Sequence, residues 1–395
     1  MAVVIVGAGM AGVQTAVALR QQGYTDGLTL LGAEPHPPYD RPPLSKDVLL
    51  GKAADSRFEI DYAELGIELA LGRRALSLDA DGHQLRTDAG DLSYDQLVLA
   101  TGAAPIALPG QPDSAFLLRT QDDAVALKAA LTPGARVAVV GAGWIGAEAA
   151  TVARQLGCEV TVVEAAPSPL AGALPTELGE RTRAWYEQAG VRLLTGAAVS
   201  GILPGGPGSP GAVHLTDGQE IEADAVVVGI GARPDTGWLD GSGVALDDRG
   251  AVAADERLRA GGVADVFAVG DCASFPSRRY GRRLTVHHWD NAMQGARVVA
   301  ANLLGGESLY NPVPYFWSEQ FGRMVQVAGV WGGDDEQIAR GDDTVLWVRD
   351  GRLVAVFTVD RPRDLAQGRK LVESGAVLDL AKAADAAVPL RSAVA

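Results

Sequence analysis

Short, continuous apolar runs recur along the chain, and the first of them leads into a glycine-rich turn. Residues 3–6 (VVIV) are all apolar, which is typical of a strand buried on both faces of a parallel sheet. A pattern of apolar and small residues then predicts a helix that ends at Gly23, and a second apolar run at 28–31 is followed by Glu34. Three glycines with the spacing GxGxxG separate the first strand from the helix: Gly7, Gly9 and Gly12.

Each part of this unit has a physical reason in a dinucleotide-binding site. The first glycine allows a tight turn, the second lets a pyrophosphate approach the backbone, and the third lets the helix pack closely on the strand. The amino end of the helix attracts the phosphates, and an acid about 20 residues further on, here Glu34, binds ribose hydroxyl groups. The unit therefore predicts a Rossmann-like half.

The same order of elements returns near the middle of the chain. Residues 136–140 predict a strand, the next helix ends at Gly157, and a strand at 159–163 runs into Glu164. The glycine turn of this second unit consists of Gly141, Gly143 and Gly146. Two such units imply that two dinucleotides bind to one chain, and the chemistry that needs both is electron transfer between a nicotinamide and a flavin.

Three further predicted strands end in residues that suit a ligand. The strands at 94–102 and 225–234 end in small residues, and the strand at 263–272 ends in an acid. The residues placed against a cofactor at these ends are Ala100, Thr101, Gly102, Gly231 and Asp271. An acid just after a buried strand can accept hydrogen bonds from ligand hydroxyl groups, although it can equally cap a turn.

Composition narrows the class of protein without naming a partner. The 395 residues are 47% hydrophobic and 21% charged, which is typical of a globular protein with large cores. A net charge of −15 disfavours broad binding to nucleic acid or to anionic membranes. No apolar run reaches the length of about 18 residues that a membrane-spanning helix needs, and the first residues predict a strand rather than a signal peptide. We therefore expect a cytoplasmic protein.

The cysteines and histidines show no pattern of a dithiol or metal site. Cys158 and Cys272 are far apart and form no CxxC motif, which disfavours a redox dithiol and a structural zinc. Five histidines have no metal-like spacing, so we expect no metal.

Two longer stretches accompany the glycine turns, PYDRPPLSK at 38–46 and VPYFWSEQ at 313–320. Together with LATGA at 99–103, LRTQDDA at 118–124 and HWDNAMQG at 288–295, they resemble the FAD-dependent NADH:ferredoxin reductases. This family includes putidaredoxin reductase and the reductase components of Rieske dioxygenases, within the glutathione-reductase-like superfamily. Dithiol members of that superfamily carry a cysteine pair after the first helix, which this chain lacks, so electrons are expected to leave directly from flavin.

The resemblance implies an α/β fold. It comprises two Rossmann-like dinucleotide-binding domains of three-layer ββα form and a C-terminal α+β domain. The expected boundaries are 1–112 and 236–312 for a discontinuous FAD-binding domain, 113–235 for an NAD-binding domain and 313–395 for the C-terminal domain. The elements expected in the last domain are strands near 324–330, 344–349 and 352–359, a hairpin turn at Asp350-Gly351, a helix near 363–374 and a frayed tail over 381–395.

The resemblance also assigns roles to residues, of which Lys46, Glu148, Trp289 and Trp317 are the predicted catalytic set. Lys46 would favour negative charge on reduced flavin, and Glu148 would hold Lys46 while facing the nicotinamide. Trp289 would begin a helix whose positive end points at the flavin, with Trp317 beside the ring. The alternative for Lys46 and Glu148 is an ordinary surface ion pair, and the alternative for the two tryptophans is simple core packing. The other implied cofactor contacts are Arg41, Arg119, Ile145 and His288. Many relatives carry glutamate two residues before the tryptophan, where this chain has His287.

The implied reaction is NADH-dependent reduction of a [2Fe-2S] ferredoxin through FAD, and the ferredoxin would supply a cytochrome P450 or an oxygenase. The alternatives are a rubredoxin reductase or NADH oxidase on the same scaffold and a non-enzymatic, NADH-sensing flavoprotein. Glu164 would repel a 2′-phosphate, so NADH is expected to be preferred over NADPH. The chain is expected to be a monomer or weak dimer that binds neither nucleic acid nor membrane.

A ferredoxin of this type is generally acidic, and this chain is acidic as well. Docking would therefore need a local basic patch. The first candidate is SRRYGRRL at 277–284, which has four arginines, and the second consists of Arg57, Arg73 and Arg74. These arginines could instead pair with acids of the chain.

Overall fold

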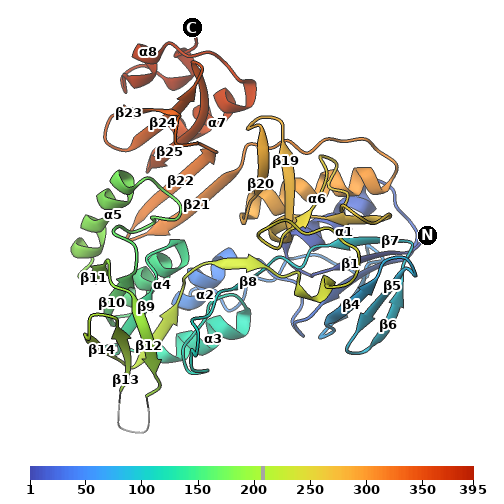
Figure 1. The fold of residues 1–395 in the computed structure, drawn as a ribbon, viewed down its shortest axis with the longest axis horizontal. Coiled ribbons are helices and arrows are strands. Elements are labelled where there is room, and N and C mark those ends of the chain that lie inside the picture. Colours follow the sequence, from blue (N-terminus) through green and yellow to red (C-terminus); the bar gives the residue numbers. More distant parts are fainter. Residues whose placement is uncertain (206–209) are drawn as a thin grey trace.

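The computed structural model describes residues 1–205 and 210–395 and shows three regions, each built on its own sheet (Figure 1). The first sheet is parallel and has the strand order β18-β7-β1-β2-β3. Its strands are β1 (Val3–Val6), β2 (Leu28–Gly32), β3 (Glu68–Leu71), β7 (Gln96–Leu99) and β18 (Val266–Ala268). Among the described residues, no helix combines the length and the apolar character needed to cross a membrane.

Both faces of the first sheet are covered, which explains why β1 is a continuous apolar run. Val3 and Ile5 pack in a core with helices α1 and α6, whereas Val4 and Val6 face the antiparallel sheet of β4, β5 and β6. The covering elements are α1 (Met10–Gln21), α6 (Trp289–Leu303), β4 (Ala75–Asp79), β5 (Gln84–Thr87) and β6 (Gly90–Ser93). The three-layer ββα arrangement is therefore confirmed for this region. A small sheet is formed by β17 (Val252–Ala253), β19 (Ala273–Ser277) and β20 (Arg282–Thr285).

The second region repeats this design around the parallel order β11-β10-β9-β15. Val137 and Val139 of β9 pack with helices α3 and α4, and Ala138 and Val140 face the sheet of β12, β13 and β14. The elements are α3 (Gln121–Ala130), β9 (Arg136–Val140), α4 (Trp144–Gln155), β10 (Glu159–Glu164), α5 (Thr176–Gln188), β11 (Arg192–Thr195), β12 (Val199–Leu203), β13 (Gly211–Leu215), β14 (Glu220–Ala223) and β15 (Ala225–Val228). The glycine- and proline-rich stretch at 204–211, which the sequence predicts to be a flexible turn, includes 206–209, outside the described residues.

Two features connect the first and second regions. The chain passes between the two regions twice, and at these crossings strands β8 (Ala103–Pro105) and β16 (Ala232–Pro234) pair antiparallel. In addition, Tyr39, Leu44 and Leu49, the last in the short helix α2 (Asp47–Leu50), pack in the same core as α3 and α4. A stretch that follows β2 of the first region is therefore part of the core of the second.

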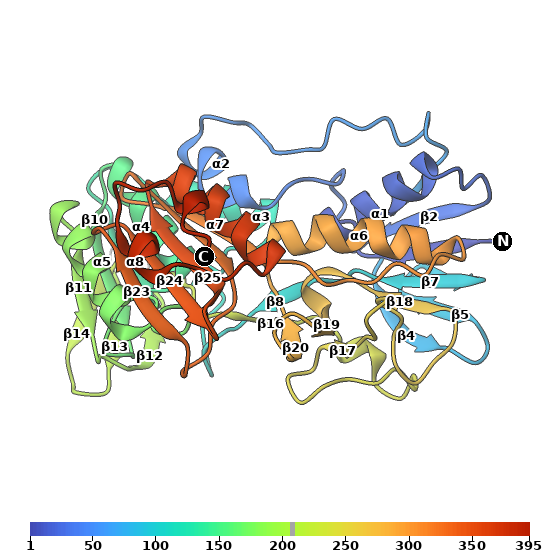
Figure 2. The ribbon, with the colours of Figure 1, turned by 90° about the horizontal axis from the view of Figure 1, so that it is seen from above.

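The third region is an antiparallel sheet in the order β21-β22-β25-β24-β23 (Figure 1). Figure 2 shows its strands β23, β24 and β25 together with the red helices α7 and α8 (Leu380–Ala384) near the C-terminus. Helix α7 packs on one of its faces, and the other face packs on residues 170–178 of the second region. The elements are β21 (Tyr315–Gln320), β22 (Arg323–Gly329), β23 (Glu336–Arg340), β24 (Thr344–Arg349), β25 (Arg352–Val359) and α7 (Pro362–Ser374). Asp350 and Gly351 have φ values of 50° and 72°, as a two-residue hairpin turn requires, so the predicted hairpin is confirmed.

The prediction of a frayed tail is wrong. The last residues form helix α8 (Leu380–Ala384), and the side chains of Leu390 and Ala393 are fully buried in the core beneath α7. The buried guanidinium of Arg340 donates hydrogen bonds to the carbonyl oxygens of Ala383 and Val388, at 3.1 and 2.6 Å. Tertiary packing therefore fixes a segment whose alanine-rich sequence shows little periodicity.

Candidate active site

The two glycine turns have nearly the same geometry. Gly7 and Gly141 have φ values of +114° and +100°, and a Cβ on either would lie within 2.5 Å of a carbonyl oxygen on a neighbouring strand end. A Cβ on Gly12 or on Gly146 would lie 1.9 Å from the carbonyl oxygen of the first glycine of its turn. At Gly9, by contrast, no atom lies within 4 Å of the position of a Cβ. The turns therefore combine tight packing with one open approach to the backbone.

A cavity of about 780 Å³ extends from the first glycine turn to the place where the three regions meet. Its size falls in the range of small-molecule and cofactor sites. Segment 38–46, the strand end at 100–105 and the beginnings of α4, α6 and β21 contribute to its wall. The predicted site residues that line it are Gly7, Gly9, Glu34, Arg41, Lys46, Ala100, Thr101, Gly102, Arg119, Ile145, Glu148, Asp271, His288, Trp289 and Trp317.

The remaining predicted residues lie outside the lining of this cavity. They are Gly12, Gly141, Gly143, Gly146, Glu164 and Gly231. Except for Gly12, all of them belong to the second glycine turn and the strand ends around it. Glu164 accepts hydrogen bonds from the backbone N–H groups of Ala142, inside the turn, and of Ala166, at 2.7 and 2.8 Å. Its carboxylate therefore helps to hold the second turn in shape.

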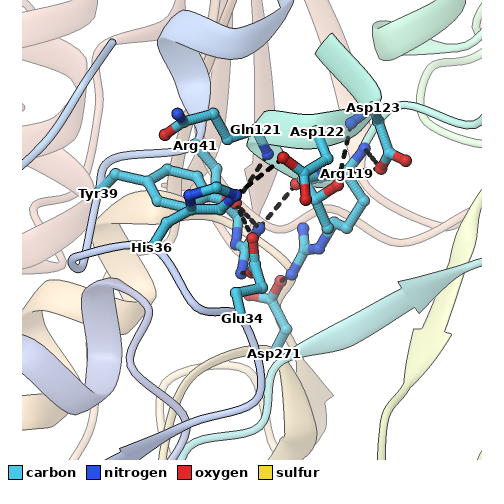
Figure 3. Close-up of polar contacts among 10 residues, drawn as sticks. Glu34, His36, Tyr39, Arg41, Arg119, Gln121, Asp122, Asp123 and Asp271 are labelled. Carbon is cyan, nitrogen blue, oxygen red and sulfur yellow. Dashed lines mark hydrogen bonds and ion pairs between the residues drawn. The ribbon is translucent and has the colours of Figure 1, made fainter. Parts of the chain in front are cut away.

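A network of charged side chains forms the end of the cavity near the first glycine turn (Figure 3). Arg41 donates to Glu34 Oε1 at 2.8 Å and to the carbonyl oxygen of Arg119 at 2.7 Å, and Tyr39 donates to Glu34 Oε2. Arg119 pairs with Asp271 at 3.4 Å. Burial raises the pKa of Tyr39 to about 12, so its hydroxyl remains a neutral donor. The arrangement brings together four residues that the sequence suggested separately.

Lys46 and Glu148 meet in another part of the cavity wall. Lys46 Nζ lies 2.7 Å from Glu148 Oε2, and the two side chains are only 18% and 4% exposed. The pair is therefore well shielded from water, unlike an exposed surface ion pair. It links segment 38–46 to the helix that follows the second glycine turn, so it spans the two nucleotide-binding regions.

Aromatic side chains form the wall beside this ion pair. The rings of Trp289 and Trp317 lie edge to face, with centroids 5.8 Å apart, and Tyr315 stacks on Trp317. Trp289 Nε1 donates to Asp40 Oδ1 at 2.9 Å, and burial raises the pKa of the Asp40 carboxyl group. The two tryptophans thus line the cavity rather than a closed core.

Two histidines before α6 line the cavity, and each has one buried ring nitrogen without a partner in the part of the chain that the structure describes. Among the described residues, neither His287 Nε2 nor His288 Nδ1 has a hydrogen-bond partner, although both atoms are buried. The His288 ring packs on the ring of Phe316, with centroids 4.5 Å apart. Burial lowers the pKa of His288 to about 4, so its ring is neutral at pH 7. No side chain caps the first turn of α6, which begins at Trp289.

Several residues of the site were not predicted. Tyr39, Asp40 and Ser45 belong to the stretch PYDRPPLSK, and Phe316 and Ser318 belong to VPYFWSEQ. The resemblance of these two stretches to the family was the signal in the sequence that could have indicated these residues. Which of their side chains would meet depends on contacts between distant segments, such as Asp40 with α6 and Ser318 with α4.

The arginines of 277–284 are engaged inside the molecule. Arg278 pairs with Glu256 at 2.6 Å, and Arg283 donates to the carbonyl oxygens of Ala254 and Ser274, both at 2.8 Å. The guanidinium of Arg279 binds backbone carbonyls near the end of α7. Much of the positive charge is therefore committed to internal contacts, and ferredoxin docking at this loop stays a prediction.

Two Rossmann-like regions that meet at one cavity, lined by a lysine–glutamate pair and two tryptophans, define an oxidoreductase that uses two nucleotides. The chain belongs to the pyridine nucleotide-disulphide oxidoreductase family, which it matches over residues 1–296, and residues 315–394 match the reductase C-terminal family. Members of the first family bind FAD and depend on NAD(H), and the cofactors of this chain are therefore FAD and NAD.

Relatives of known role match almost the whole chain. The ferredoxin reductase component of chlorobenzene dioxygenase from Cupriavidus sp. (strain PS12) is 39% identical, over 99% of this chain and 97% of its own. The ferredoxin–NAD(+) reductase component of the anthranilate 1,2-dioxygenase system from Burkholderia cepacia is 37% identical, over 98% of both chains. The crystal structure of the covalent putidaredoxin reductase–putidaredoxin complex superposes with a TM-score of 0.93 at 32% identity, over 99% of this chain and 97% of the other.

The residues present fit FAD. The open backbone at Gly9 admits a pyrophosphate, and Glu34 stands at the carboxyl end of β2, where a ribose would bind. The rings of Trp289 and Trp317 in the wall of the same cavity suit a flat heteroaromatic ring. Gly7, Gly9, Arg119 and Asp271 would hold the cofactor along the cavity, with Lys46 and Trp289 at its reactive end.

Proposed function

We propose that this protein is an NADH:ferredoxin reductase that acts in the cytoplasm. The observation that carries the proposal is the reach of the cavity, which is lined by Trp144, Ile145 and Glu148 of the helix that follows the second glycine turn. A nicotinamide held by the second turn can therefore meet the cofactor held by the first. When bound, FAD supplies the chemistry that accepts a hydride from NADH and releases electrons one at a time.

The side chains of this region set charge and solvent access. Lys46, fixed by Glu148, and the uncapped start of α6 both place positive charge at the cavity, which favours negative charge on a group bound between them. His288 adds no charge at pH 7, because burial lowers its pKa to about 4. Trp289 and Trp317 line the same part of the cavity, where their rings would limit the access of water to a bound flavin.

The thiols support direct electron release. Cys158 and Cys272 are buried free thiols, and neither lines the cavity as far as the described residues define it. A dithiol relay would need a pair of thiols beside the flavin. The names of the dioxygenase-system relatives favour a ferredoxin as the acceptor. We expect a [2Fe-2S] ferredoxin, which would in turn supply an oxygenase or a cytochrome P450.

Anaerobic titration with NADH, followed by addition of a panel of [2Fe-2S] ferredoxins, tests this function. We expect a yellow protein that NADH bleaches and that at least one ferredoxin reoxidises. Rubredoxin and air-saturated buffer serve as the competing acceptors. Faster reoxidation by either of them than by every ferredoxin would identify a rubredoxin reductase or an NADH oxidase, and bleaching without turnover on any acceptor would favour an NADH sensor.

A further inference from the structure

The carboxylate of Glu148 is held by more than the predicted lysine. Lys46 Nζ and Ser45 Oγ donate to Oε2 at 2.7 and 2.5 Å, and Ser318 Oγ donates to Oε1 at 2.7 Å. These donors come from two distant parts of the chain, segment 38–46 and β21. Ser318 is fully buried and Glu148 is 4% exposed, so water does not compete for these bonds.

Strand β21 lies alongside α4 in a register that brings these two residues together. The ring of Phe316 packs on Trp144 with centroids 4.5 Å apart, and two residues further along the strand Ser318 meets Glu148. Two strand residues span about 7 Å, and four helix residues span about 6 Å, so the two spacings match. The register leaves Ser318 opposite Glu148, one helical turn from the start of α4.

The direction of the hydrogen bonds follows from the available protons. An ionised carboxylate only accepts, and a serine hydroxyl has one proton, so Ser318 donates to Glu148. The oxygen of Ser318 in turn accepts from Gln320 Nε2 at 3.2 Å, and Gln320 is also fully buried. A continuous relay therefore runs from Gln320 through Ser318 and Glu148 to Lys46.

We propose that Ser318 is a positioning residue for the reaction between nicotinamide and flavin. Its hydroxyl fixes the Glu148 carboxylate, and the same carboxylate sets the position of Lys46. The proposal rests on the proposed function, because this geometry matters only if hydride transfer takes place in the cavity. Among the described residues, Ser318 is the donor to Oε1, so its removal leaves the carboxylate held at Oε2 alone and able to turn within a broad torsional well. The position of Lys46 would then be less well defined.

Stopped-flow reduction of the FAD-loaded protein by NADH separates rate from binding. We expect Ser318→Ala to lower the limiting rate of flavin reduction about tenfold, as loss of a supporting hydrogen bond commonly does, and to change the apparent Kd for NADH less than about twofold. Ser318→Thr keeps the hydroxyl and should recover most of the rate. If Ser318→Ala does not fold, Ser318→Cys preserves the volume with a weaker donor and should show an intermediate rate.

A double-mutant cycle with Glu148→Gln tests whether Ser318 acts through Glu148. In that background Ser318→Ala should have little further effect on the reduction rate, and thermal melts of the FAD-free proteins should show the same non-additivity. Thr358→Val removes another fully buried hydroxyl from the same sheet and should leave the rate unchanged. An unchanged rate in Ser318→Ala, or equal slowing with and without Glu148, overturns the proposal. Failure of the proposed function looks different, because the parent protein itself would then not be reduced by NADH or would reduce no ferredoxin.

Discussion

The two glycine turns are built alike, yet the acids that follow them have different partners. The side chains of Arg41 and Tyr39 hold Glu34 in the first region, and all three residues line the cavity. Backbone N–H groups hold Glu164 in the second region, outside the lining of that cavity. An acid held by side chains in the cavity wall suits a cofactor that is retained between turnovers, whereas an acid held by backbone groups outside that wall suits a nucleotide that exchanges in every turnover.

The largest expected difference between the regions comes from their third glycines. A Cβ at either position would lie 1.9 Å from a backbone oxygen, so alanine forces the helix away from its strand at a cost of about 3 kcal/mol. We expect Gly12→Ala to yield a colourless protein, and Gly146→Ala to keep FAD but to resist bleaching by NADH. Bound flavin per chain, melting temperature and anaerobic bleaching are the measurements.

Gly172→Ala is the matched control, because no atom lies within 4 Å of the position of its Cβ. It should retain both flavin and NADH response. Equal loss of FAD in Gly12→Ala and Gly146→Ala would contradict the division of cofactors between the two regions.

A smaller effect concerns the acid sensitivity of the first region. Burial lowers the pKa of His288 from 6.5 to about 4, so between these values the unfolded chain binds a proton that the folded chain does not. Folding is therefore weakened as pH falls from about 6.5 towards 4, and this residue should account for about 2 kcal/mol between pH 7 and pH 5. Urea unfolding of the FAD-free protein should show a flatter pH profile for His288→Phe, whose ring can still pack on Phe316. Parallel profiles for parent and variant would mean that His288 binds its proton at the same pH in the folded and the unfolded chain.

The smallest effect is on the choice of nucleotide in the second region. We expect kcat/KM to favour NADH over NADPH by at least about tenfold, or roughly 1.4 kcal/mol, and Glu164→Ala to narrow this ratio. Arg183 lies closer than its place in the sequence suggests, because it bonds Thr195 Oγ1 at 3.0 Å, and Thr195 pairs with Glu164 across the sheet. Glu180 holds Arg183 through two contacts of 2.8 Å.

Adding Glu180→Ala to Glu164→Ala should free Arg183 to bind the 2′-phosphate of NADPH. The ratio of kcat/KM for NADH to that for NADPH should therefore narrow further. Glu180→Ala alone should change it little, because Glu164 would still repel the phosphate. An identical NADH:NADPH ratio in the parent and in Glu164→Ala would remove Glu164 from nucleotide selection.

Local patterns predicted the elements of this molecule better than its contacts. The runs around Gly7 and Gly141, and the Asp350-Gly351 turn, define strands and turns from neighbouring residues alone, and the structure contains them. The packing of Leu390, by contrast, depends on a core assembled from distant strands, so the tail was wrongly expected to be frayed. In the site, the glycine spacing indicated where nucleotides bind, and the family resemblance implied the pairing of Lys46 with Glu148. The side chains that hold Glu34, and the two serines that also donate to Glu148, depend on contacts between distant segments and emerged only in the structure.

The discontinuity of the first sheet has a consequence for synthesis on the ribosome. Its edge strand β18 and its covering helix α6 come after the entire second region in the chain, so β1, β2, β3 and β7 emerge long before their sheet can be completed. At typical elongation rates of about 5–20 residues per second, this interval is on the order of ten seconds or more. The strands of the second region follow one another in the chain, so this region can form during that time. Its core includes Tyr39 and Leu44, which belong to the part of the chain that is synthesised first. The flavin cavity can therefore be completed only after α6 and β21 have been synthesised, when the whole second region is already available.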